Sequence, residues 1–510
     1  MSLKNLGAES VKLPFDPEKL YDVVVIGGGS AGISFATEAR ELGLSVALFD
    51  YVDPSNQGST WGLGGTCVNV GCIPKKLFHI ASMVEEEAHL RQSYGWQVNN
   101  ETTQHNWSVL RDNIQNYIKG LNFGYISKMK EVGVDYVNAF ARFENKNEVG
   151  FIFKGKDYKI HAKNFVVAAG GRPRDYPGVP ELAKHAITSD DLFNLDRDPG
   201  KTLVVGGGYI AVECAGFLNG LGKEVTLINR SVFLRVMDDD MAFRIIDDME
   251  MHGVEALRKT VPVSVTKVGE KYQVVLKVDG VERTVDYDTV LVAIGRDPAP
   301  ERMGLDKIGV ELARSGKVQG REGEMERSNH DHIYALGDIL EGVPELQTVA
   351  AKSGRILANR IAARLKSAEE SVIEKFATDY RHIPTTVFSP TEYSFVGPTE
   401  AEAIAEHGED GIEVYHREVT PLQYELVTNN LKSAYMKVIC DKSDGERVLA
   451  IHYVGPEAAE VIAGYALAMK LGLRKADLDA AMGVHPSTSE DLFTLDITKR
   501  SGKDFRKTGC

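Results

Sequence analysis

Residues 21–50, YDVVVIGGGSAGISFATEARELGLSVALFD, determine the fold of the first part of the chain. The stretch begins with a β-branched run, passes through a glycine-rich turn and alanine-rich helix formers, and ends in a second apolar run, SVALF. This order predicts a strand, a turn, a helix and a second strand. Because strands joined in this way form a βαβ unit, we expect an α/β fold with a parallel sheet.

The turn inside this stretch carries a nucleotide-binding pattern. Gly27, Gly29 and Gly32 fit G-x-G-x-x-G, in which the glycines make a tight turn, let the backbone approach a pyrophosphate and allow close helix packing. Asp50, at the end of the second strand, is placed to hydrogen-bond the hydroxyl groups of a ribose. We interpret the unit as a dinucleotide site, and a glycine turn without a ligand is the alternative.

The same pattern returns at residues 201–231, KTLVVGGGYIAVECAGFLNGLGKEVTLINRS. Three small residues fit the variant of the motif that ends in alanine: Gly206, Gly208 and Ala211. The second strand ends without an acid and is followed by Arg230, Ser231 and Arg235. Arginines offer planar donors to a 2′-phosphate, whereas an acid would accept from a 2′-hydroxyl. We therefore expect NADPH rather than NADH, and solvated surface arginines are the alternative.

A pair of cysteines lies between the two units, in GGTCVNVGCIPKK. The spacer between Cys67 and Cys72, with Pro74 after it, suits a helix whose first turns place both sulfurs on neighbouring faces. A helix start also lowers the pKa of a thiol, so we interpret the cysteines as a redox pair. Zinc is the competing interpretation, but no further Cys or His partner at suitable spacing is nearby, and we expect no metal. Lys75 either lends positive charge to a flavin or thiolate or is an ordinary exposed lysine.

Exchange between thiols and disulfides needs an acid that protonates the leaving thiolate, and histidine titrates in the right range. The segment HPSTSED supplies His485, which precedes a proline, and Glu490 lies five residues on, able to orient the imidazole. A lone histidine is more often structural. The presence of the cysteine pair favours the catalytic role.

Length and composition limit the class of protein. A chain of 510 residues is too long for one core, and after about residue 380 the pattern changes to PTTVFSPTEYSFVG, ERVLAIHYVG and a helical AAEVIAGYALAMKLGL. We expect a third domain there, a sheet with helices. The net charge of −14 disfavours nucleic acid and anionic membranes, and no apolar run approaches the ~20 residues of a membrane span.

The cysteine count and the N-terminus bear on the compartment. Five cysteines in so long a chain are no secreted disulfide framework, and residues 1–21 contain no export signal. We expect a cytoplasmic protein; a mitochondrial one would require a presequence that has been removed. Cys214 lies in a predicted helix and Cys440 in an apolar strand, and we expect both to be buried small residues.

These motifs resemble those of the pyridine nucleotide-disulfide oxidoreductases, which include glutathione reductase, trypanothione reductase and the large-type thioredoxin reductases. The resemblance covers almost the whole chain and includes HIYALGD, VVAAGGRPR and VLVAIGRDP. It implies two Rossmann-like domains, which bind FAD and NADPH, and a C-terminal α+β dimerisation domain. The implied bounds are 1–175 with 301–372 for FAD, 176–300 for NADPH, 373–498 for dimerisation and 499–510 for a redox arm.

The resemblance also implies roles for single residues. Asp338 would contact the ribityl or phosphate portion of the flavin, Glu213 would pair with Lys75 beneath the isoalloxazine, and Tyr209 would be a lid that moves for nicotinamide. Cys72 would lie against the flavin while Cys67 exchanges with the substrate. The further cofactor contacts that it implies are Ser30, Tyr51, Thr66, Ala141, Gly170, Ile210, Gly295, Arg296, Gln347 and Thr348.

Within the family, two segments resemble the large-type thioredoxin reductases: the insert YVDPSNQGSTWGL before Gly64, and LNFGY at residues 121–125. This implies NADPH-dependent reduction of thioredoxin by a homodimer, in which His485 and Glu490 reach into the active site of the partner. Glutathione reductase is the alternative function. A non-catalytic flavoprotein that senses nicotinamide redox state would need neither the cysteine pair nor the histidine.

The tail TLDITKRSGKDFRKTGC resembles the mobile arm that carries electrons from Cys67 and Cys72 to thioredoxin. The arm of the family normally holds two redox groups, often cysteine with selenocysteine, whereas Cys510 is the last residue here. We expect a truncation at a selenocysteine codon or a deletion, and therefore poor thioredoxin reduction; a natural single-cysteine arm is the alternative. The basic residues of the tail either steer an acidic substrate or form a solvated charge run.

Overall fold

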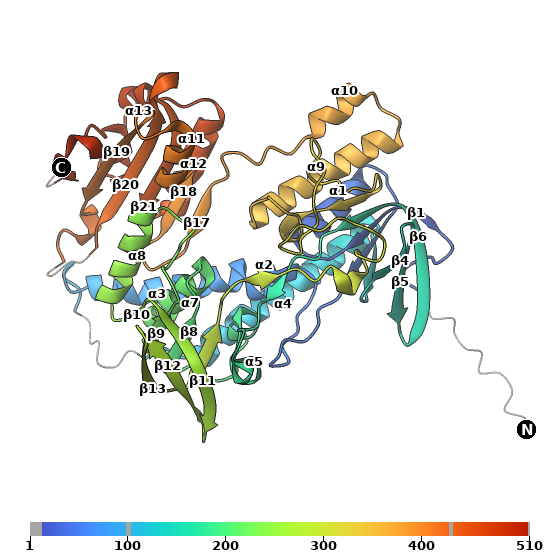
Figure 1. Cartoon of the computed structure of the whole chain (residues 1–510), viewed down its shortest axis with the longest axis horizontal. Coiled ribbons are helices and arrows are strands. Elements are labelled where there is room, and N and C mark those ends of the chain that lie inside the picture. The colour runs from blue at the N-terminus through green and yellow to red at the C-terminus, as the bar shows by residue number, and fades with distance from the viewer. Residues whose placement is uncertain (1–12, 98–103, 428–431, 508–510) are drawn as a thin grey trace, which may run out of the picture.

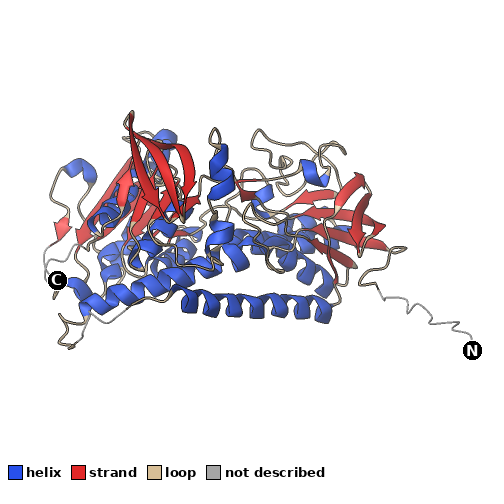
Figure 2. Cartoon of the chain, turned by 90° about the horizontal axis from the view of Figure 1, so that it is seen from below, coloured by secondary structure: helices blue, strands red, loops and turns tan. Residues whose placement is uncertain are grey.

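The protein is described by a computed structural model over residues 13–97, 104–427 and 432–507. Figure 1 shows three α/β bodies: a sheet with β1 and β6, a sheet with β8 and β9, and a sheet with β18 to β21. Seen from below in Figure 2, long helices lie along one side of the molecule and the strands gather towards its two ends. We name these bodies the first, second and third domains.

The first domain contains a seven-stranded sheet in the order β3-β2-β1-β6-β5-β4, with β16 also on β6. Strands β3, β2, β1, β6 and β16 pair in parallel, and β5 and β4 continue antiparallel. The strands are β1 (Leu20–Ile26), β2 (Val46–Asp50), β3 (Asp135–Asn138), β4 (Arg142–Asn145), β5 (Glu148–Phe153), β6 (Lys156–Val167) and β16 (Ile333–Ala335). Val23, Val24 and Val25 are each 0% exposed, as expected for a parallel strand covered on both faces.

The helices of the first domain are α1 (Ser30–Glu41), α2 (Gly65–Val70), α3 (Cys72–Leu90), α4 (Trp107–Val132) and α9 (Gln347–Leu365). One difference from the prediction concerns the cysteine segment. It is not a single helix, because the backbone breaks at Gly71 (φ −138°, ψ −118°) and Cys72 is the first residue of α3. The break also puts the sulfur of Cys72 in the first turn of a helix, which the prediction did include.

The second domain follows the same plan as the first, with a four-stranded parallel sheet in the order β10-β9-β8-β14. An antiparallel sheet, β11-β12-β13, lies beside it. The elements are β8 (Thr202–Val205), α7 (Tyr209–Gly220), β9 (Val225–Ile228), α8 (Asp239–Met251), β10 (Glu255–Leu257), β11 (Thr260–Val268), β12 (Lys271–Val278), β13 (Val281–Tyr287) and β14 (Thr289–Val292). Two short links, β7 (Arg172–Pro173) and β15 (Arg296–Asp297), pair where the chain enters and leaves this domain.

The third domain is a six-stranded sheet in the order β17-β18-β21-β20-β19-β22, covered by helices. Its elements are β17 (Thr385–Val387), β18 (Tyr393–Val396), α11 (Glu400–His407), β19 (Ile412–Val419), β20 (Ala434–Asp441), β21 (Arg447–Val454), α12 (Ala458–Lys470), α13 (Lys475–Ala480) and β22 (Arg506–Lys507). All neighbouring pairs are antiparallel except β19 with β22. The predicted fold class, two Rossmann-like domains and an α+β domain, is confirmed, while the residue-exact domain bounds stay a prediction.

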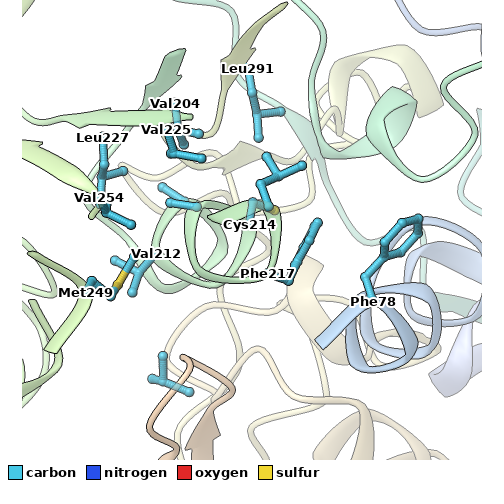
Figure 3. Packing of buried hydrophobic residues seen from close by; sticks show 14 of the residues in the cluster. Phe78, Val204, Val212, Cys214, Phe217, Val225, Leu227, Met249, Val254 and Leu291 are labelled. Carbon is cyan, nitrogen blue, oxygen red and sulfur yellow. The ribbon is translucent and has the colours of Figure 1, made fainter. Parts of the chain in front are cut away.

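One apolar core connects all three domains. Figure 3 shows Phe78 of α3 close to Phe217 and Cys214 of α7, and Val387 and Tyr393 of the third domain belong to the same cluster. Cys214 and Cys440 are each 0% exposed, so both are buried as predicted. Within the described ranges, no helix is long and apolar enough to cross a membrane.

Gly354 offers a test of how closely α1 and α9 pack. A Cβ at this buried position would lie 2.7 Å from the carbonyl oxygen of Ala31. Because backbone cannot give way as a flexible side chain does, we expect Gly354→Val to lower the free energy of unfolding by about 1–3 kcal/mol or more. Gly120→Ala is the control, since a Cβ there meets nothing within 4 Å and should stabilise α4 by about 0.5–1 kcal/mol. Thermal denaturation of both variants checks this, and equal melting temperatures would contradict it.

Candidate active site

A cavity of about 400 Å³ lies where the first and second domains meet. Most of the residues predicted to bind a cofactor or to carry redox chemistry line it. They are Gly27, Gly29, Ser30, Asp50, Tyr51, Thr66, Cys67, Cys72, Lys75, Gly170, Tyr209, Ile210, Glu213, Arg296, Asp338, Gln347 and Thr348. The fold thus brings together residues that are up to 321 positions apart, from Gly27 to Thr348.

The glycine turn at one end of the cavity fits a dinucleotide. Gly27 has φ +113°, and the N–H of Gly28 donates to Oδ1 of Asp50 at 2.9 Å. Gly29 precedes α1 and no side chain caps this helix, so its first N–H groups are free to bind a phosphate. Burial raises the pKa of Asp50 to about 6. The turn, the uncapped helix and the buried carboxyl group fit the pyrophosphate and ribose of FAD.

Some predicted residues do not line the cavity. A Cβ on Gly32 would lie 1.9 Å from the carbonyl oxygen of Gly27, so this glycine lets α1 pack against the turn. Ala141 is 2% exposed and packs in the apolar core of the first domain, and Gly295 lies one residue before β15. Their contacts with a cofactor stay predictions.

Cys67 and Cys72 are free thiols that face the cavity from either side of Gly71. Their side chains share a hydrogen bond, which lowers the pKa of Cys72 and, together with burial, raises the pKa of Cys67. The ammonium of Lys75 lowers the pKa of Cys72 further. Cys72 is therefore the sulfur that holds a thiolate more readily.

Lys75 and Glu213 form a buried ion pair at the floor of the cavity, as the resemblance implied. Burial opposes the charge of Lys75, but the Glu213 carboxylate outweighs it and raises the pKa of the lysine. The other oxygen of Glu213, Oε1, accepts a hydrogen bond from the backbone N–H of Phe388 at 2.7 Å. The Nζ of Lys75 also lies 4.8 Å from the ring centroid of Tyr209, whose pKa burial raises to about 12.

Two asparagines that the sequence analysis missed hold the cysteine segment in place. Asn69 is 3% exposed, and its Nδ2 donates to the carbonyl oxygens of Gly65 and Gly62 at 2.8 and 3.2 Å. Asn122 of α4 donates to Asn69 Oδ1 at 2.9 Å and to the carbonyl oxygen of Leu63 at 2.7 Å. Asn69 could have been found from the sequence, because it is a polar residue between the two cysteines. Asn122 lies in the segment LNFGY that the resemblance singled out, but no pattern pointed to its contact with a residue 53 positions away.

Arg296 connects several residues along another wall of the cavity through hydrogen bonds. Its guanidinium donates to Asp190 Oδ1 at 3.1 Å, to the carbonyl oxygen of Gly171 at 2.8 Å and to Thr66 Oγ1 at 3.3 Å. Nearby, the guanidinium of Arg172 lies 4.6 Å from the ring of Trp61, which belongs to the insert. The insert therefore packs at the edge of the cavity.

His485 and Glu490 form the predicted pair, with Nδ1 of the imidazole 3.0 Å from Oε1 of the carboxylate. The imidazole is 66% exposed, and neither residue lines the cavity that holds the cysteines. The pair thus lies in the third domain with its imidazole open to contacts from outside this chain.

The second glycine turn lies beside the cavity rather than in it. Gly208 precedes α7 without a side-chain cap, and Ala211 is fully buried against Gly206. Arg230 and Arg235 are exposed, and neither forms an ion pair within the described part of the chain. Their donors, with the half-buried Ser231 between them, are available for a phosphate group.

The described part of the tail packs on the third domain, and Cys510 lies outside the described residues. Lys499 pairs with Asp240 and Glu400, Arg500 with Glu413, and Lys507 with Asp491. These three cations are neutralised within the chain. Lys503 and Arg506 are exposed and form no ion pair within the described residues, so a steering role of the tail stays a prediction for these two. Within the described residues, no group of three or more His, Cys, Asp or Glu side chains is arranged to hold a metal ion.

Comparison with known proteins gives two family matches and a curated relative that aligns over almost the whole chain. Residues 21–354 match the sequence model described as pyridine nucleotide-disulphide oxidoreductase, and residues 383–495 match that of the dimerisation domain of the same group. The chain is 45% identical over 504 residues to thioredoxin reductase SEP1 of Emiliania huxleyi, an alignment that covers 97% of this chain and 99% of that protein.

The charge of Lys75 can be tested through the acidity of Cys72. In a chain with Cys67→Ser and Cys510→Ser, we expect Lys75→Met to raise the pKa of Cys72 by about one unit or more, because an adjacent cation is lost. The rate of alkylation of Cys72 by iodoacetamide against pH, with the modified peptide identified by mass spectrometry, measures this.

Lys76→Met is the matched control for that experiment. Its Nζ is bound to Glu392 at 2.6 Å and lies 4.0 Å from the ring centroid of Phe388. We therefore expect its loss to leave the pH dependence of Cys72 alkylation unchanged. Equal shifts in the two variants would show that Lys75 has no special effect on the thiol.

Proposed function

We propose a function that starts from the family to which this chain belongs, the pyridine nucleotide-disulphide oxidoreductases. The chain is an oxidoreductase that acts on sulfur groups. We infer that it uses NADPH to reduce the disulfide of thioredoxin, through FAD, the pair Cys67 and Cys72, and the arm with Cys510. The single observation that carries this proposal is the thiol pair beside the buried cation of Lys75, at the wall of a cavity that fits a dinucleotide.

The cavity residues would hold FAD and leave the two sulfurs at its edge. The free N–H groups of α1 and the carboxyl of Asp50 would bind the pyrophosphate and the ribose, and Asp338 would contact the ribityl or phosphate portion. When bound, FAD supplies the chemistry that turns a hydride into the electron pair that a disulfide takes up. Arg230, Ser231 and Arg235 would bind the 2′-phosphate of NADPH.

The two cysteines have different roles in thiol-disulfide exchange. Cys67 first gives its proton to His485 and then attacks one sulfur of the incoming disulfide, on the arm or on the substrate, to form a mixed disulfide. His485 returns the proton to the sulfur that leaves. Cys72, whose pKa is lowered, then attacks Cys67 as a thiolate. This closes the Cys67–Cys72 disulfide and releases the second sulfur as a thiolate, which takes a proton from solvent, so two electrons pass from the pair to the incoming disulfide.

The place of His485 supports a homodimer. The His485–Glu490 pair is exposed and lies away from the cavity of its own chain, within the segment that matches the dimerisation domain. We infer that each active site combines Cys67 and Cys72 of one subunit with the histidine of the other. Glu490 would hold the imidazole by its Nδ1 and leave Nε2 to donate the proton.

The acceptor is tested by NADPH oxidation with thioredoxin or glutathione disulfide. We expect a chain extended past Cys510 by selenocysteine and glycine to reduce thioredoxin at least about tenfold faster than the chain that ends at Cys510, because the second redox group closes a reducible bridge. Turnover of glutathione disulfide by both proteins, with no gain for thioredoxin on extension, would favour glutathione reductase instead.

The shared active site is tested with mixed dimers. We expect Cys67→Ser and His485→Ala each to lower thioredoxin turnover of the extended enzyme by about 10²-fold or more, since each removes an essential group. A dimer that joins one subunit of each kind should regain about half of the wild-type turnover, because one of its two sites is then complete.

Purification with a different tag on each subunit gives the mixed dimer for this measurement. The parent homodimers, mixed without subunit exchange, are the control. A mixed dimer as inactive as its parents would show that each chain uses its own histidine.

A further inference from the structure

A buried lysine of the third domain reaches into the second domain. The Nζ of Lys437, on β20, lies 2.7 Å from Asp238 Oδ1, 2.6 Å from Asp240 Oδ2 and 2.7 Å from Glu400 Oε2, and its side chain is 1% exposed. Burial opposes its charge, but the three carboxylates, Asp238 first, outweigh this and raise the pKa of the lysine. Lys437 is thus a fixed cation between two domains.

One of its three partners, Asp238, marks the start of α8. The carbonyl oxygen of Asp238 accepts from the N–H of Ala242 at 2.9 Å, which is the first bond of the helix. Its Oδ2 accepts from the backbone N–H of Glu400 at 3.1 Å, and the residue is 2% exposed. The third domain therefore fixes the point at which α8 begins.

Arg235 lies between this point and a second anchor. Leu234, with φ +51°, donates its N–H to the carbonyl oxygen of Gly207 at 2.7 Å and so ties the loop to the glycine turn. Only three residues, 235–237, separate Leu234 from Asp238. Because both ends are held, the backbone that carries the exposed Arg235 has little freedom, and it keeps this arginine close in the chain to the anchor on the second glycine turn.

We propose that Lys437 is a positioning residue for the 2′-phosphate site: it fixes Asp238 and thereby holds Arg235 where it can bind the phosphate that distinguishes NADPH from NADH. This inference rests on the proposed use of NADPH. It makes the discrimination between the two nucleotides depend on a residue of the third domain, 202 positions from the arginine that it serves (437 − 235).

The charges of the cluster give the physical reason. Lys437 and Lys499 are its two cations, and Lys499 is 35% exposed and bound to Asp240 at 2.9 Å and to Glu400 at 2.8 Å. Without Lys437, three carboxylates would face a single lysine at the surface. Their mutual repulsion would drive Asp238 and Asp240 apart and release the start of α8, and the loop with Arg235 would follow.

The test is the affinity of the oxidised, FAD-containing enzyme for NADP⁺ and for NAD⁺, each measured by isothermal titration calorimetry. We expect Lys437→Met to reduce the preference for NADP⁺, taken as the ratio of the two Kd values, at least about tenfold, the size of one lost charge-assisted contact. The Kd for NAD⁺ should stay within about twofold. Lys437→Arg should keep most of the preference, because the charge remains.

Asp238→Asn is a second variant in case Lys437→Met does not fold. It removes the charge of Asp238 and leaves at most a neutral hydrogen bond to the lysine, while Lys437 keeps Asp240 and Glu400, so no buried charge loses all its partners. We expect the same fall in preference for NADP⁺. Lys432→Met is the matched control, because Lys432 also joins the third domain to α8, at Asp248, 3.4 Å away and 13 positions past Arg235 (248 − 235).

The following results would overturn the inference. An unchanged ratio in Asp238→Asn, or an equal fall in Lys432→Met, would show that Lys437 does not act through the start of α8. Wild-type enzyme without preference for NADP⁺ would overturn both this inference and the proposed use of NADPH. A wild-type preference that the variants retain would overturn the inference alone.

Discussion

The buried ion pair between Lys75 and Glu213 is the interaction on which the rest of the candidate active site depends. It joins α3 of the first domain to α7 of the second, and the backbone of Phe388 in the third domain binds the same carboxylate. Desolvation offsets much of the attraction between buried charges, so such a pair specifies an arrangement more than it adds stability. Here it places a cation beside Cys72 only when all three domains are docked.

Short sequence patterns predicted those parts of the molecule whose structure depends on residues that are close together in the chain. The two glycine turns, the apolar runs around them and the Cys67–Cys72 segment each lie within about 30 residues. Both strand-turn-helix-strand units are present, and the cysteine segment is helical apart from the break at Gly71. The pairing of Lys75 with Glu213 was also predicted, although 138 residues separate them, because the resemblance to a family supplied it. Without that resemblance, neither charge had a sequence signal that named its partner.

The features that were not predicted are long-range or made by the backbone. The break at Gly71, the support that Asn122 gives Asn69, and the N–H of Phe388 on Glu213 follow from how distant segments meet. The tail shows the same limit. From the sequence its basic residues either steer a substrate or form a solvated charge run, and only the fold reveals the carboxylates of Asp240, Glu413 and Asp491 opposite three of them.

The parallel pairing of β22 with β19 has a consequence for how copies of this protein behave in a crowded solution. β19 lies next to the end of the third-domain sheet, where the N–H groups of Glu418 and His416 bind the carbonyl oxygens of Phe505 and Ile497. An open strand edge invites pairing with another chain, and proteins commonly cover it. The C-terminal segment thus covers this strand and protects it from pairing with another chain. The stacking of Phe505 on His416 holds the segment in place. A chain cut before Phe505 would leave the N–H of Glu418 unpaired and open this end of β19 to pairing with another chain.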